Sequence, residues 1–199
     1  YDRVLLCQFD SQWQRTAIAE ECRDSARSLL NYRFPASDIP AIVRDRYAIN
    51  PIRHIPDVQA RVVPLVPASD SLNLPTLDLT AGVLRALSPF HYQYLCEINI
   101  AASLSIAITN EQQLWGVLIC HHFSASEISA AERDAAFNLV QMASQRLFLL
   151  QARQQAYFLE QVLNSRELLS AERDKVVQPT TLLDKYAKNW MKLFNCSGI

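Results

Sequence analysis

The densest group of potentially reactive side chains in the sequence is Cys120-His121-His122. Cysteine and histidine bind transition metals, and both take part in nucleophilic catalysis. If this segment is a strand, adjacent side chains point to opposite faces, so His121 and His122 cannot easily bind one metal ion. We therefore expect one of them to face the interior and the other to face outward, and we predict no metal site.

The other candidates stand apart along the chain, and each has an ordinary structural interpretation. His91 falls in the first turn of a predicted helix, and Asp38 stands where a helix cap is expected. Arg53 and Arg85 lie beside apolar runs, and exposed arginines need no special role. No local pattern combines a nucleophile, a base and a group that orients the base, so we predict that this chain is not an enzyme.

Composition excludes several classes of function. Five scattered cysteines without a CxxC pair favour free thiols in a reducing, cytoplasmic compartment. Three glycines in 199 residues are too few for a Gly-rich phosphate loop or a dinucleotide-binding motif. A net charge of −1 favours neither nucleic acid nor an acidic membrane surface. No apolar run approaches the roughly 20 residues of a membrane-spanning helix.

The pattern in the first half of the chain predicts two strands, a short helix and a long ordered loop segment. The strands cover residues 4–9 and 16–22, and residues 25–37 read as irregular. A helix of about two turns opens at Asp38-Ile39-Pro40, with a side-chain cap, and ends before Pro51. Residues 51–80 are rich in Pro, Ser and Asp, with β-prone pieces at 52–55 and 62–66. An ordered excursion of that length usually has a function.

The second half predicts a helix, an antiparallel hairpin and a very long helix. Ser88-Pro89 starts a helix that runs to about residue 99. Residues 102–108 alternate small polar with apolar side chains, which predicts a half-buried strand, and residues 114–120 return after a turn at 110–112. Ser129 and Glu132 form a capping box, after which the pattern stays helical to about residue 177. Residues 181–194 read as a further helix.

This order of elements predicts an α+β domain with an antiparallel sheet flanked by helices, followed by a long connecting helix. One domain of about 150 residues plus an appendage fits the length. The chain lacks an initiator methionine and stops soon after an apolar run, so we expect it to be part of a longer protein. A helix longer than a single domain needs predicts a connection, and also a seam for a homodimer.

Four long strings, in order, resemble the GAF domain of phytochromes. They are Phe34-Pro35-Ala36-Ser37-Asp38-Ile39-Pro40, Leu84-Arg85-Ala86-Leu87-Ser88-Pro89-Phe90-His91-Tyr92-Gln93-Tyr94-Leu95, Ala102-Ser103-Leu104-Ser105-Ile106 and Leu114-Trp115-Gly116-Val117-Leu118-Ile119-Cys120-His121-His122. The opening, Tyr1-Asp2-Arg3-Val4-Leu5-Leu6, is similar too. The resemblance implies a GAF domain over residues 1–150, a connecting helix over 151–178 and the start of a PHY domain over 179–199.

The resemblance implies a red-light sensor that binds a linear tetrapyrrole (a bilin), most simply biliverdin. Arg53 and Arg85 would then clamp a propionate, a bidentate pairing that suits guanidinium groups. Tyr47, Ser103 and Ser105 would donate hydrogen bonds to the two propionate tails.

The remaining implied contacts concern the pyrrole rings. Asp38, with Ile39 and Pro40, would present its backbone carbonyl to the ring N–H groups, and His91 would hold a bridging water there. His121 would donate to the carbonyl of the isomerising ring. Tyr94 and Phe34 would line the pocket around that ring.

Two departures from the family pattern affect these expectations. Plant-type members attach the bilin to a cysteine immediately before the helix histidine, and Phe90 occupies that position here. The chain therefore resembles the bacterial class, whose attachment cysteine lies upstream, and the covalent cysteine is not expected in this chain. Cys7 stands where many relatives have a tyrosine near the isomerising ring, so altered photochemistry is expected.

The leading hypothesis is a bilin-binding sensor whose signal passes through a PHY domain to an output domain, such as a histidine kinase. An upstream PAS-type segment is expected as a partner in the same protein. The alternative is a GAF domain without pigment that serves interaction and dimerisation, with redox input through Cys7 or Cys96. The residues implied to bind the propionates favour the first hypothesis.

Overall fold

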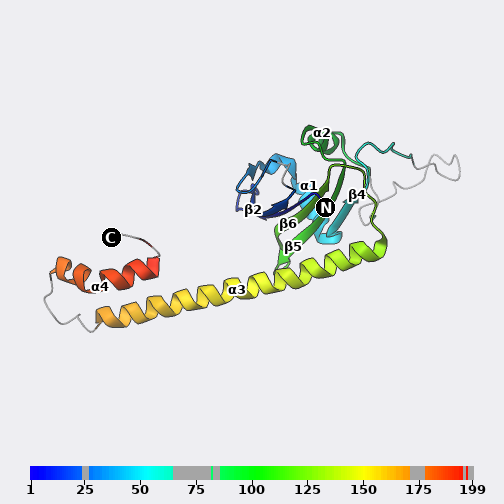
Figure 1. The fold of residues 1–199 in the computed structure, drawn as a ribbon. Coiled ribbons are helices and arrows are strands. Elements are labelled where there is room, and N and C mark those ends of the chain that lie inside the picture. The colour runs from blue at the N-terminus through cyan, green and yellow to red at the C-terminus, as the bar shows by residue number, and fades with distance from the viewer. Residues whose placement is uncertain (24–26, 65–81, 83–85, 171–177, 195, 197–199) are drawn as a thin grey trace. The chain divides into compact units, whose positions relative to one another are not determined.

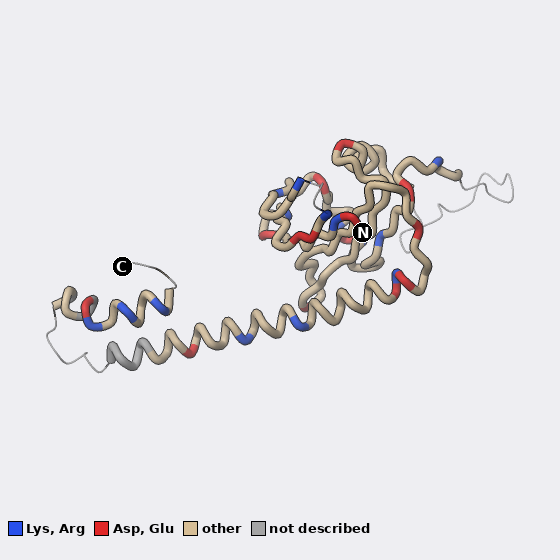
Figure 2. The backbone as a smooth tube through the Cα atoms, in the orientation of Figure 1, with Lys and Arg blue, Asp and Glu red and all other residues tan. Residues whose placement is uncertain are grey.

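The computed structural model describes residues 1–23, 27–64, 82, 86–170, 178–194 and 196. The chain divides into two compact units, Tyr1–Ser144 and Gln145–Ile199, which are described separately. In the first unit acidic and basic residues are interspersed along the chain (Figure 2). No helix among the described residues is both long enough and apolar enough to cross a membrane.

The first unit is built on one antiparallel sheet of six strands in the order β3-β2-β1-β6-β5-β4 (Figure 1). The strands are β1 (Arg3–Phe9), β2 (Arg15–Cys22), β3 (Arg33–Phe34), β4 (Ile52–Ile55), β5 (Ala102–Asn110) and β6 (Gln113–His122). The predicted strands at 4–9, 16–22, 102–108 and 114–120 are confirmed, each with extended bounds. The β-prone piece at 52–55 is β4, whereas residues 62–64 form no strand and 65–66 lie outside the described residues.

The β5–β6 hairpin turns as expected. Glu111 and Gln112 adopt left-handed backbone angles, with φ of 49° and 66°. A two-residue loop with both φ values positive matches the twist of the strands that it joins. The hairpin therefore brings Ser103 directly opposite His121 on the neighbouring strand.

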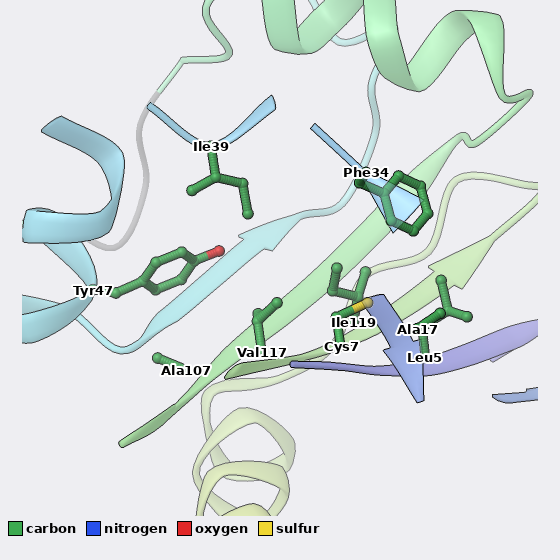
Figure 3. Close-up of a cluster of buried hydrophobic side chains, with 9 residues drawn as sticks. All are labelled: Leu5, Cys7, Ala17, Phe34, Ile39, Tyr47, Ala107, Val117 and Ile119. Carbon is green, nitrogen blue, oxygen red and sulfur yellow. The ribbon is translucent and has the colours of Figure 1, made fainter. Parts of the chain in front are cut away.

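The expectation that residues 102–108 form a half-buried strand is wrong, because all seven are buried. β5 lies inside the sheet, between β6 and β4. The first turns of α3 (Ala130–Ser170) cross the face of the sheet opposite Tyr47 and Ile39 (Figures 1 and 3), and Val140 of this helix is buried. With both faces covered, the alternation of side-chain size no longer marks a solvent face.

The core on the other face gathers small and aromatic side chains from the sheet and from the segments above it. Figure 3 shows Tyr47 from α1 (Ala41–Ile49) and Phe34 from β3 lying over Val117 and Ile119 of β6. Cys7 lies fully buried in the same cluster. This packing fixes the floor on which a ligand site can be built.

Two of the helices begin at side-chain caps. In α2 (Pro89–Glu97) the Ser88 side chain accepts a hydrogen bond from the backbone N–H of His91 at 3.2 Å. The predicted capping box of α3 is confirmed, since Ser129 and Glu132 exchange side-chain to backbone hydrogen bonds. The last described helix, α4 (Pro179–Phe194), begins two residues earlier than expected.

The helix predicted to open at Asp38 starts later and has a different cap. Residues Ala36–Asp38 form a short 3-10 turn, η1, and α1 begins at Ala41 after Pro40, without a side-chain cap. The expectation that Asp38 caps this helix is therefore wrong. Its carboxylate instead forms an ion pair with Arg15.

Candidate ligand-binding site

A cavity of about 520 Å³ lies on the face of the sheet that carries α1 and α2. That volume is in the range of small-molecule and cofactor sites, roughly 300–1,000 Å³. Its lining comes from β2, η1, α1, β4, α2, β5 and β6. The lining residues are Arg15, Ser37, Asp38, Ile39, Pro40, Ile42, Val43, Arg46, Tyr47, Asn50, Arg53, Ile55, Ala86, Ser88, Phe90, His91, Tyr94, Leu95, Ser103, Ser105, Ile119 and His121.

One part of the lining carries hydroxyl and guanidinium groups. Ser103 and Ser105 are two residues apart on β5 and so point to one face. Arg53 of β4 pairs with Ser105 across the ladder, and its guanidinium donates to the Ala86 carbonyl at 3.3 Å. The hydroxyls of Tyr47 and Ser105 lie 3.1 Å apart. This set has the donors that a carboxylate ligand requires.

Two neutral histidines face the same cavity. Burial, reinforced by the Arg53 and Arg15 guanidinium groups, lowers the pKa of His91 to about 4. Burial, with Arg3, Arg15 and His91, lowers the pKa of His121 to about 3. His121 is 3% exposed, and its Nδ1 has no hydrogen-bond partner among the described residues. A buried polar atom without a partner is costly and suggests a polar group of a ligand or a water as its partner.

Arg15 joins three elements around Asp38. Its Nη2 lies 3.6 Å from the Asp38 carboxylate and 3.4 Å from the Tyr94 hydroxyl. Its guanidinium stacks over the ring of Phe34, 4.4 Å from the ring centroid. Burial raises the pKa of Asp38, and the Arg15 charge opposes that rise.

The structure brings most of the sequence-predicted site residues together around this cavity. The predicted residues that line it are Asp38, Ile39, Pro40, Tyr47, Arg53, His91, Tyr94, Ser103, Ser105 and His121. Arg85 lies outside the described residues. The open question about β6 is answered too: His121 faces the cavity, while His122 pairs with Asp2 at 3.2 Å.

Phe34 and Cys7 were expected at the site, but neither is a lining residue. The ring of Phe34 lies beneath the Arg15 guanidinium. Phe34 and Cys7 both belong to the core cluster of the sheet. Phe34 is therefore not among the lining residues of this cavity, and its expected place around the isomerising ring stays a prediction. Cys7 supports the site from within the core.

Sequence reasoning missed Arg15, Arg46 and Asn50. Arg15 precedes Ala17 by two residues on β2, so it shares the buried face of that strand, but the predicted strand began one residue too late to show this. Val43, Arg46, Tyr47 and Asn50 follow the i, i+3, i+4, i+7 spacing of one helix face. That spacing was available in the sequence as a signal for the α1 wall.

Residues 14–147 match the GAF domain family. This chain belongs to that family. Its GAF domain is 42% identical over 144 residues to Cyanobacterial phytochrome B of Nostoc sp., covering 72% of this chain and 19% of the relative. It is 32% identical to a bacteriophytochrome of Xanthomonas campestris over 100% of this chain and 32% of the relative. The chain thus spans at most about a third of the length of these curated relatives.

Solved structures agree with the sequence relatives. The crystal structure of the chromophore-binding domain of an unusual R. palustris bacteriophytochrome matches with a TM-score of 0.72 and 37% identity, over 77% of this chain and 51% of that one. A longer structure of the R. palustris bacteriophytochrome matches with a TM-score of 0.82 and 32% identity, over 99% of this chain and 40% of that one. The resemblance to phytochrome GAF domains is confirmed, as is the α+β fold with its long following helix.

Proposed function

We propose that this GAF domain binds a bilin, biliverdin most simply, and senses red light. The observation that carries the proposal is the composition of the cavity. Hydroxyl and guanidinium donors line one part of it, and His121, whose buried Nδ1 has no hydrogen-bond partner in the described part of the chain, lines another. A linear tetrapyrrole with two propionates presents the matching carboxylates and a ring carbonyl. When bound, it would supply light absorption and isomerisation of its terminal ring.

Different residues of this chain would bind different parts of the ligand. Arg53, Tyr47, Ser103 and Ser105 would bind the propionates, and Arg85, expected beside them from the sequence, belongs to the same proposal. The neutral imidazole of His121 would donate a hydrogen bond to a ring carbonyl. His91 and the backbone at Asp38, Ile39 and Pro40 would face the ring nitrogens. Tyr94 would limit rotation of the terminal ring.

We further propose that no residue lining the described cavity attaches the ligand covalently. None of the lining residues is a cysteine, and Phe90 occupies the position before His91. Cys7 is the nearby thiol of the core, and burial raises its pKa to about 11. A thiol with so high a pKa carries little of the nucleophilic thiolate at neutral pH.

The longer protein would use this domain as its light input. We propose that residues 179–199 begin a PHY domain, that a PAS-type segment precedes the GAF domain, and that an output domain follows. The described residues carry no catalytic role in this proposal. These assignments rest on the phytochrome relatives, which are three to five times longer than the stretch matched here.

Absorption spectroscopy tests the proposal directly. Two proteins are mixed with biliverdin, namely this chain alone and the longer protein that contains it. Their absorption spectra are recorded before and after red illumination. We expect a red-shifted band that light converts reversibly. A fixed band would indicate a pigment-binding domain with impaired switching.

Matched variants separate binding from folding. Arg53→Ala should weaken biliverdin binding by at least tenfold, because a bidentate partner of a propionate is lost. Arg61→Ala removes an exposed arginine that does not line the cavity and should leave binding unchanged. If neither the chain nor the longer protein gives a band, the interaction and dimerisation module becomes the better assignment.

A further inference from the structure

We propose that Arg15 sets the charge state of the ligand: its guanidinium neutralises Asp38, and so lowers the proton affinity of the ring nitrogens of a bound tetrapyrrole. This inference rests on the proposed bilin-binding function. It adds a residue that lines the cavity and that the family resemblance did not point to. It also predicts a property of the bound ligand: the tetrapyrrole ring system loses its proton more readily in this site than it would without Arg15.

Burial and contacts with several elements fix the position of the Arg15 side chain. The side chain is 6% exposed and contacts groups from three different elements, namely Asp38 of η1, Phe34 of β3 and Tyr94 of α2. Its Nε is buried and has no hydrogen-bond partner among the described residues. If this guanidinium turned out to solvent, the partly buried Asp38 carboxylate would lose its cation, which is unfavourable.

The other titratable groups near Asp38 are uncharged at neutral pH, so Arg15 is the charge that offsets its carboxylate. From α2, Tyr94 is uncharged because burial raises the pKa of its hydroxyl, and His91 is neutral. From β6, His121 is neutral as well, and from β1 the Cys7 thiol is protonated. Arg53 of β4 and Arg46 of α1 are further cations of the cavity lining. Among the described lining residues, Arg15, Arg46 and Arg53 thus face a single carboxylate, that of Asp38.

This balance acts on a bound tetrapyrrole in two ways. Its carboxylate tails are stabilised by electrostatic attraction to the arginines of the cavity lining. Its ring nitrogens lose proton affinity, because the Asp38 carboxylate that would stabilise a cationic ring is already paired with Arg15. Removing the Arg15 charge should therefore raise the pH at which the bound ligand loses its ring proton by about one to two units, a ten- to hundredfold rise in proton affinity.

The test titrates bound biliverdin by absorbance from pH 6 to 11 in four proteins. These are the parent chain, Arg15→Gln, Arg15→Lys and the control Arg23→Gln, whose arginine pairs with Asp2 and does not line the cavity. We expect the midpoint to rise in Arg15→Gln and to stay near the parent value in Arg15→Lys and in the control. An unchanged midpoint in Arg15→Gln overturns the proposal, as does an equal shift in Arg15→Lys.

A second pair of variants keeps the test open if Arg15→Gln does not fold. Asp38→Asn alone and Asp38→Asn with Arg15→Met differ by the Arg15 charge, and neither leaves a buried carboxylate unpaired. The double variant should show the higher midpoint by about tenfold in proton affinity, because the Arg15 charge disfavours a cationic ring whether or not Asp38 is ionised. Equal midpoints would contradict the inference.

A measurement without ligand distinguishes failure of this inference from failure of the proposed function. Carbon-detected NMR of the ligand-free chain follows the Asp38 carboxyl through its titration. We expect Arg15→Gln to raise that pKa and Arg15→Lys to leave it near the parent value. If biliverdin does not bind but the Asp38 pKa moves, Arg15 is the counter-ion and the bilin assignment fails. If the Asp38 pKa does not move, the role of Arg15 is wrong whatever the ligand.

Discussion

His91 and His121 face the cavity, and burial of their side chains disfavours the charged form of imidazole. Both have folded-state pKa values, about 4 and about 3, that lie below the ordinary value of 6.5. Neutral imidazole offers one donor and one acceptor nitrogen, whereas the charged ring offers donors only. At neutral pH the two histidines can therefore accept as well as donate, which suits a ligand that carries both N–H groups and carbonyls.

The same pKa shifts make folding sensitive to acid. Between pH 6.5 and about 4 the unfolded chain binds protons on both imidazoles while the folded chain does not, so the free energy of unfolding should fall as the pH is lowered through this range. Urea unfolding at pH 7.0 and pH 5.0 measures the loss. In the double variant His91→Gln, His121→Gln the difference between the two pH values should shrink.

Two other groups serve as internal references for this measurement. His54 remains in both proteins, and its pKa is also lowered by burial. Asp38 has a raised pKa and acts with the opposite sign, since its folded form takes up a proton first. An unchanged pH dependence in the double variant would show that other groups carry the acid sensitivity.

The hydrogen bond between Tyr47 and Ser105 joins α1 to β5 beneath the proposed propionate site. Tyr47→Phe and Ser105→Ala should each destabilise the ligand-free domain by about 1 kcal/mol, because a buried hydroxyl loses its partner. The double variant should cost less than the sum of the two, with a coupling of about 0.5–1.5 kcal/mol. Urea unfolding of the four proteins gives this cycle, and strict additivity would mean that the two hydroxyls do not interact.

Among the strands, Gly116 of β6 lets β1 approach closely. A methyl group at this position would overlap the backbone carbonyl oxygen of Cys7 on the neighbouring strand. Backbone cannot rotate away as a side chain can, so Gly116→Ala should destabilise the domain by about 1–3 kcal/mol. Thermal unfolding checks this, with Gln113→Ala at the exposed start of the same strand as control. A Gly116→Ala variant as stable as the parent would show that β1 can shift freely at Cys7.

At the end of α2, Asn99 adopts a left-handed backbone with φ of 55°. Its N–H bonds to the Cys96 carbonyl and that of Ile100 to the Leu95 carbonyl, while Leu95 and Ile100 share a core cluster. This is the Schellman ending of a helix, in which glycine is preferred and asparagine tolerated. It explains how asparagine is accommodated with a positive φ at this position.

The Schellman ending makes a prediction about substitutions of Asn99. Asn99→Ala should destabilise the domain by about 1 kcal/mol, and Asn99→Gly should not, because only the alanine adds a strained Cβ in this conformation. Chemical unfolding measures both. Glu97→Ala, inside the helix, is the control for loss of an exposed polar side chain. Equal stability of the alanine and glycine variants at position 99 would rule out backbone strain as the cause.

For the whole molecule, α3 presents apolar side chains to solvent over much of its length. Leu139, Met142, Leu149, Leu150 and Phe158 are all exposed in the single chain, by 43–68%. Charged residues are sparse there (Figure 2), with Arg146, Arg153 and Glu160 as the charged positions between 135 and 163. So large an apolar surface on a helix is unusual unless another surface covers it.

We expect this helix to pair with that of a second copy. Met142→Glu together with Leu149→Glu should shift the chain from dimer to monomer in sedimentation velocity, since two charges would be buried at the seam. Gln151→Glu places a comparable charge on α3 at an exposed polar position and should leave the dimer intact. A parent chain that is monomeric at high micromolar concentration would contradict the pairing.

Much of the fold and part of the site were accessible from the sequence. The period-two and helical patterns located the strands, α2 and α3, because both depend on local spacing and on caps such as Ser88 and Ser129. The family resemblance pointed to Tyr47, Arg53, His91 and His121, all of which line one cavity. Arg15 was missed because its importance depends on Asp38, Phe34 and Tyr94, which lie 19 to 79 residues away along the chain.

The sequence by itself determined the kind of domain, since hydrophobic period, turn residues and caps act over a few neighbouring residues. Tertiary structure alone decided which polar groups are buried together. It covered both faces of β5, turned Asp38 from a helix cap into the partner of Arg15, and placed the ring of Phe34 beneath the Arg15 guanidinium. Burial and electrostatic pairing depend on distances across the sheet, and no spacing along the chain encodes those distances.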